Sequence, residues 1–113
     1  MKILRMILIN TFMLFPLQVM AQESNVMNAK NLLVACTTPD MEWISFCNGF
    51  FQAVNDQQTA LGKLCLPSGT TRTRATEIFH EEAAVLLSKY PDQGLRPAIH
   101  VAGEILVKNF PCK

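Results

Sequence analysis

Four cysteines constrain the fold of this chain more than any other feature. They lie at Cys36, Cys47, Cys65 and Cys112, and no two of them have the C-x-x-C spacing of a thioredoxin-like redox site or a zinc ribbon. An even number of cysteines in a short exported domain predicts disulfides, so we expect two bonds and no metal or other cofactor. A domain this short has only a marginal core unless such bonds stabilise it.

The N-terminus has the pattern of a secretory signal peptide. Lys2 and Arg5 precede an apolar run over residues 6–17, and Val19 and Ala21 occupy the minus-three and minus-one positions of a cleavage site. We therefore predict a signal peptide at residues 1–21 and a mature domain at 22–113. The run is short for a membrane span, so we expect no membrane association after cleavage; a retained signal anchor is the alternative.

Apolar residues recur at intervals of three and four along the mature domain, which is typical of helices. The pattern predicts a helix of two or three turns within residues 23–36 and a second over about 39–61. A third runs from a cap at Thr70 or Thr71 to Tyr90, and Pro97 opens a fourth that Pro111 stops. No stretch alternates apolar and polar residues over the length of a strand. The predicted fold class is therefore all-α, a small bundle of four helices stapled by two disulfides.

The helix at 39–61 is predicted to be central, with Thr38 as its N-cap. Its aromatic and aliphatic residues share one face, which we expect to be buried. Gly49 is unusual there, because glycine inside a helix costs about 1 kcal/mol relative to alanine. Close packing of a second helix over Gly49 would offset that cost. The residues of the predicted buried face are Trp43, Ile44, Cys47, Phe50, Phe51, Val54 and Leu61.

The lengths of the segments between the cysteines indicate how they pair. Cys47 and Cys65 are about 18 residues apart, or about 27 Å if the segment is helical, far beyond the roughly 7 Å that a disulfide spans between Cα atoms. Short connections bring Cys65 to the same end of the bundle as Cys112. Cys36 stays near Cys47. We predict Cys36–Cys47 and Cys65–Cys112, worth about 3 and about 4 kcal/mol.

Residues that suggest catalysis do not form a complete site. The HEEAA sequence at 80–84 has Ala84 where a zinc protease has its second histidine. Glu81 and Glu82 are adjacent, so they lie on different sides of a helix and cannot act as an acid/base pair. His100 is isolated. The nearly balanced charge disfavours nucleic acid or an anionic membrane as the main partner, so we predict a binding protein rather than an enzyme.

Several short motifs resemble those of the Rap/Tai immunity proteins. They are FCNGF at 46–50, CLPSGT at 65–70, YP at 90–91 followed by PA at 97–98, and FPC at 110–112. Together they cover nearly all of the mature domain in the same order as in that family. Phe50 stands where the family usually has tyrosine, and Ala53 where it usually has glycine.

The resemblance implies a periplasmic, homodimeric helical protein that binds a peptidoglycan amidase effector of the type VI secretion system and blocks its Cys-His active site. In the family, a loop between the last two helices enters the toxin cleft. The prolines on both sides and Gly94 predict a rigid, sharply reversing turn here. An ordinary helix connector is the alternative, and a small periplasmic acid-stress chaperone is the alternative function. The corresponding partner-binding residues are Tyr90, Pro91, Asp92, Gln93, Gly94, Leu95 and Arg96.

Overall fold

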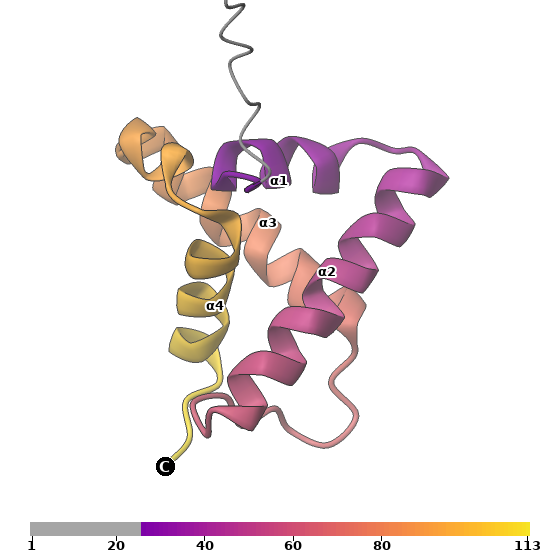
Figure 1. Cartoon of the computed structure of the whole chain (residues 1–113), viewed down its shortest axis with the longest axis vertical. Helices are drawn as coiled ribbons and strands as arrows, with labels where there is room; N and C mark the ends of the chain where they lie inside the picture. Colours follow the sequence, from indigo (N-terminus) through magenta and orange to yellow (C-terminus); the bar gives the residue numbers. More distant parts are fainter. Residues whose placement is uncertain (1–25) are drawn as a thin grey trace, which may run out of the picture.

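The computed structural model describes residues 26–113, which form four α-helices and one short 3-10 helix (Figure 1). In chain order these are α1 (Ala29–Thr37), α2 (Met41–Ala60), α3 (Arg72–Lys89), η1 (Pro91–Leu95) and α4 (Ala98–Asn109). Within these residues only two isolated backbone bridges resemble strand pairing, so the predicted all-α bundle of four helices is confirmed. The predicted signal peptide, residues 1–21, lies outside the described residues.

Polar residues at the helix starts bind backbone N–H groups that have no partner within the helix. Asn28 accepts a hydrogen bond from the N–H of Asn31 at 2.8 Å at the start of α1. Thr71 does the same for Arg74 at 3.1 Å at the start of α3, one of the two caps that the sequence predicts. Each such cap stabilises the fold by about 1 kcal/mol.

The start of α2 differs from the prediction. Asp40, not Thr38, is the N-cap, and its carboxylate accepts a hydrogen bond from the N–H of Glu42 at 2.9 Å. Thr38 is engaged elsewhere, because its hydroxyl donates to the carbonyl of Val34 at 2.7 Å at the end of α1. Pro39 therefore lies in the connection between the two helices and not in the first turn of α2.

Side chains from all four α-helices meet in one core. Figure 1 shows α1 across one end of the molecule, α2 and α4 leaving that end on opposite sides, and α3 crossing behind them. Phe51 of α2 and Phe79 of α3 are fully buried, with ring centroids 5.1 Å apart. Other buried members of the core are Ala29, Leu32, Val54, Leu64, Ala75, Ala83, Val101, Ala102 and Leu106.

The predicted buried face of α2 is only partly correct. Cys47, Phe51 and Val54 are buried, but Trp43 is 41% exposed. Ile44 and Leu61 are exposed as well. The helices α1, α3 and α4 pack on the inner side of α2, and no described element lies along its outer side (Figure 1). A periodic apolar pattern marks the side chains that prefer burial but does not supply a helix to cover each of them.

The expected close packing at Gly49 is wrong. A Cβ atom added at Gly49 would meet no atom within 4 Å, and the residue is exposed. Two other glycines make the close approaches in this fold. A Cβ at Gly94 would lie 3.1 Å from the Cβ of Lys30, and one at Gly103 would lie 2.9 Å from the side-chain nitrogen of Gln58.

Both predicted disulfides are confirmed. Cys36–Cys47 joins α1 to α2 with a Cα separation of 5.5 Å, and Cys65–Cys112 joins the segment after α2 to the C-terminal end at 4.9 Å. Beside the second bond, the N–H of Cys65 donates to the carbonyl of Phe110 at 3.0 Å. The two bonds therefore close the bundle at two places that are distant along the chain, which limits the freedom of the unfolded state.

Candidate functional site

The segment predicted to bind a partner forms a short helix. Pro91 begins η1, since its fixed φ suits a first helical position, and Tyr90 precedes it as the cap. The carbonyl of Tyr90 accepts a hydrogen bond from the N–H of Gln93 at 3.0 Å, and the carbonyl of Gln93 accepts one from Arg96 at 3.3 Å. The predicted turn is thus ordered by its own backbone bonds, and Pro97 follows it as the cap of α4.

Backbone hydrogen bonds of the residues that follow η1 attach this part of the chain to the start of α1. The N–H of Ala29 donates to the carbonyl of Arg96 at 2.9 Å, and the N–H of Ala98 donates to the carbonyl of Met27 at 2.8 Å. Gly94 is buried against Lys30. We expected Gly94 to provide a sharp reversal, but it does not have a positive φ. Gly94 lets η1 approach α1 closely. Because Gly94 is buried in this contact, it is not available to a partner.

Arg96 holds η1 to α4. Its Nη1 donates to the side-chain oxygen of Gln93 and to a carboxylate oxygen of Glu104, both at 2.9 Å, and its Nη2 donates to the other oxygen of Glu104. Hydrogen bonding to Arg96 lowers the pKa of Glu104, and the same bond raises the pKa of Arg96. Gln93 and Arg96 therefore form contacts within the chain, and these contacts fix the position of η1.

The remaining predicted residues face solvent. Tyr90 is 59% exposed and Leu95 is 74% exposed, and Pro91 and Asp92 are exposed between them. An exposed tyrosine and leucine on a fixed backbone suit an apolar contact with another protein. Of the seven residues predicted from the sequence, these four form the accessible surface.

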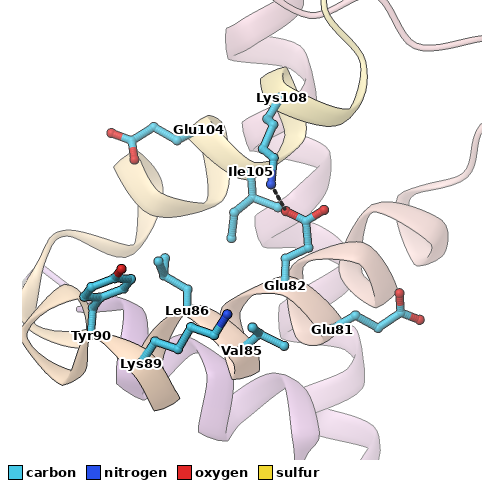
Figure 2. A pocket seen from close by; sticks show the side chains of 9 residues that line it. All are labelled: Glu81, Glu82, Val85, Leu86, Lys89, Tyr90, Glu104, Ile105 and Lys108. Carbon is cyan, nitrogen blue, oxygen red and sulfur yellow. Dashed lines mark ion pairs between the residues drawn. The ribbon is translucent and has the colours of Figure 1, made fainter.

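A groove between α3 and α4 lies next to these residues (Figure 2). Its volume is about 540 Å³, and the side chains of Val85, Leu86 and Ile105 form its apolar part. Tyr90, the residue that precedes η1, stands at one end, so the groove adjoins η1. Lys108 and Glu82 form an ion pair across it at 3.5 Å. The other residues that line it are Glu81, Lys89 and Glu104.

Sequence reasoning missed this groove because its residues come from two helices. The one available signal was Val85, a large aliphatic residue that lies four positions after Glu81 and four before Lys89 and is 55% exposed. Such a residue on an otherwise charged helix face indicates a contact with something outside the core. A sequence does not show which residue of α4 will stand opposite it.

The candidate catalytic residues are not brought together. Glu82 pairs with Lys108 and accepts a hydrogen bond from Asn109 at 2.8 Å. Within residues 26–113 no three histidine, cysteine or acidic side chains are placed to hold a metal ion. None of the helices in that part of the chain has the length and apolar character needed to cross a membrane.

These features define a class of protein: a small helical domain, closed by two disulfides, that presents an ordered projecting segment beside an apolar groove. Residues 28–112 match the model of the family of Rap1a immunity proteins, and the chain belongs to that family. The match includes all four helices and all four cysteines. No curated protein and no solved structure matches the chain. Membership indicates an immunity protein directed against a secreted toxin.

Proposed function

We propose that this protein is a periplasmic immunity protein that binds a type VI secreted peptidoglycan amidase and blocks its active site. The family match over residues 28–112 is the observation that carries the proposal. The predicted signal peptide and the two disulfides favour an exported protein in an oxidising compartment, where an incoming cell-wall amidase would act. The protein then acts by contact and performs no reaction of its own.

The toxin-facing surface consists of η1 together with the groove between α3 and α4. Tyr90 and Leu95 are the apolar anchors, and Asp92 adds a polar contact at the tip. The bonds of Arg96 to Gln93 and Glu104 hold η1 in place before binding. A segment that is already ordered loses little conformational entropy when it enters a cleft, which favours tight inhibition.

The experiment pairs this protein, purified after export, with an amidase encoded beside its gene. We expect it to stop peptidoglycan cleavage and to bind with nanomolar or tighter affinity. Changing both Tyr90 and Leu95 to alanine should weaken binding by at least about 100-fold, since exposed aromatic and aliphatic anchors carry most of the energy of such contacts. The melting temperature should stay close to that of the parent.

Leu61→Ala is the matched control, because Leu61 is also exposed but caps the C-terminal end of α2, which lies away from η1 (Figure 1). It should bind like the parent. Full inhibition by the Tyr90 and Leu95 variant would place the contact elsewhere. Absence of binding to every neighbouring amidase, together with protection of other proteins from acid-induced aggregation, would favour the small acid-stress chaperone.

The proposal includes a homodimer, as the family resemblance implies. The exposed apolar residues of α2, which lie away from η1, support it because soluble proteins rarely leave several such residues together without a partner. Light scattering on the exported protein tests this directly, and a monomer at all concentrations would contradict it.

A further inference from the structure

The charged residues that line the α3–α4 groove differ in whether they have a partner within the chain. Glu82, Glu104 and Lys108 each form an ion pair. Glu81 and Lys89 also line the groove, but neither forms an ion pair within residues 26–113. One negative and one positive charge are therefore available to a bound partner.

These two charges lie on one line along α3, with an exposed aliphatic residue between them. Glu81, Val85 and Lys89 follow one another at intervals of four, which places them on one side of the helix. At the rise of an α-helix the line is about 12 Å long. Figure 2 shows Lys89 near Tyr90 and Glu81 at the opposite end of the groove. The end next to η1 thus carries the positive charge, and the far end carries the negative one.

The middle of the groove is apolar and held in place by the core. Ile105 is a buried member of the core, and Leu86 packs against it. Val85 lines the same groove and is 55% exposed, so an apolar side chain that covers Val85 removes both from water. The volume of the groove, about 540 Å³, is large enough for a bulky side chain of a partner.

We propose that this groove binds a segment of the amidase in which an apolar residue lies between a basic and an acidic one. The apolar residue covers Val85, the basic residue pairs with Glu81, and the acidic residue pairs with Lys89. The groove adjoins η1 at Tyr90, so both contacts belong to one continuous surface. The inference rests on the proposed inhibition of an amidase and names the chemistry of the toxin segment that the groove accepts.

The order of the two charges lets the groove select its toxin. A segment with the opposite order places like charges together at both ends of the groove, and like charges in contact cost affinity. A segment without charges removes Glu81 and Lys89 from water without giving them partners. These two residues therefore determine specificity, whereas Val85 contributes affinity.

The test uses the purified exported protein and the amidase encoded beside its gene. The double variant Glu81→Lys with Lys89→Glu keeps the net charge of the protein and reverses the order of the charges. We expect the dissociation constant for the amidase to rise at least about tenfold. Val85→Ala should raise it by a similar factor, since it removes the apolar contact. All three positions are exposed on α3, so the melting temperatures should change little.

Arg74→Glu with Glu77→Arg is the matched control. It also exchanges a basic and an acidic residue on α3, and both side chains are exposed, but neither lines the groove. This variant should bind the amidase as the parent does. Unchanged binding by the variant with exchanged charges at Glu81 and Lys89 would overturn the proposed selection.

Photocrosslinking identifies the toxin segment directly. A benzoylphenylalanine in place of Val85 should attach to a stretch of the amidase that has an apolar residue between a basic and an acidic one. Attachment to a stretch that lacks these charges, or to a second copy of this chain, would contradict the inference.

Failure of this inference is distinguishable from failure of the proposed function. If the parent stops the amidase and the groove variants stop it equally well, the groove does not select the toxin but the inhibitory function stands. A parent that binds no neighbouring amidase would overturn both.

Discussion

The guanidinium of Arg96 binds the carboxylate of Glu104 through both of its terminal nitrogens, and Nη1 also donates to Gln93 at 2.9 Å. The bond joins the residue after η1 to the middle of α4. It therefore fixes the segment that we propose enters the toxin cleft. The pair lies at the surface, so its contribution to the free energy of unfolding is small. Its main effect is to hold η1 in position.

Replacing Glu104 by glutamine should lower the free energy of unfolding at pH 7 by less than about 1 kcal/mol, as for other surface ion pairs. The folded pKa of Glu104 lies below its unfolded value, so the contribution is complete above the unfolded pKa and is lost as the pH falls through the folded one. The parent and Glu104→Gln should thus become equally stable in acid.

Urea unfolding at several pH values checks this. Glu81→Gln is the control, because Glu81 forms no ion pair within residues 26–113. Hydrogen exchange at the N–H groups of η1 should increase in Glu104→Gln at pH 7. A stability difference that persists unchanged at pH 2 would show that the carboxylate charge is not its source.

The two disulfides should contribute unequally to the free energy of unfolding. Changing Cys65 and Cys112 together to serine should cost about 4 kcal/mol, and changing Cys36 and Cys47 together about 3 kcal/mol, because the first bond closes the longer loop. Either loss is large compared with the whole stability of a small domain. Thermal unfolding of the two double variants measures the order, and a larger loss for the shorter loop would contradict the entropic account.

Glycine-to-alanine changes should have opposite effects at two positions. Gly94→Ala should destabilise the fold by about 1 kcal/mol or more, because the new Cβ would lie 3.1 Å from Lys30 and 3.3 Å from Leu87. Gly49→Ala should raise helix stability by up to about 1 kcal/mol. Denaturation at a concentration where the chain is monomeric compares the two. Equal effects on stability would show that η1 and α1 are farther apart at Gly94 than in this structure.

Asn55 is buried in α2, and its side-chain oxygen has no hydrogen-bond partner among the described residues. A buried polar atom without a partner costs about 1 to 3 kcal/mol, and leucine has the same branching and the same number of side-chain heavy atoms as asparagine, although it is larger. Asn55→Leu should therefore raise the free energy of unfolding by about 1 kcal/mol, measured in urea. A loss of stability would instead indicate a buried water bound to the amide.

The candidate site could be predicted only in part. The segment 90–96 is correctly located between the last two helices, because Pro91 and Pro97 interrupt the helical pattern on both sides. Its division into residues that are free to meet a partner, such as Leu95, and residues that are bonded within the chain, such as Arg96, depends on α1 and α4, which are distant along the chain. The groove beside it requires α3 and α4 to be placed together, and no local pattern contains that information.

The sequence by itself determined the four helices and the pairing of Cys36 with Cys47 and of Cys65 with Cys112, because apolar spacing, prolines and segment lengths act locally or through simple distance limits. Only the tertiary structure decided which side of α2 is covered and which glycine is packed. The sequence does not distinguish Gly49 from Gly94. Of these two, only Gly94 packs closely against other side chains, because such contacts depend on where the other helices lie. A residue's preference for burial is a property of its side chain, whereas its burial is a property of the whole fold.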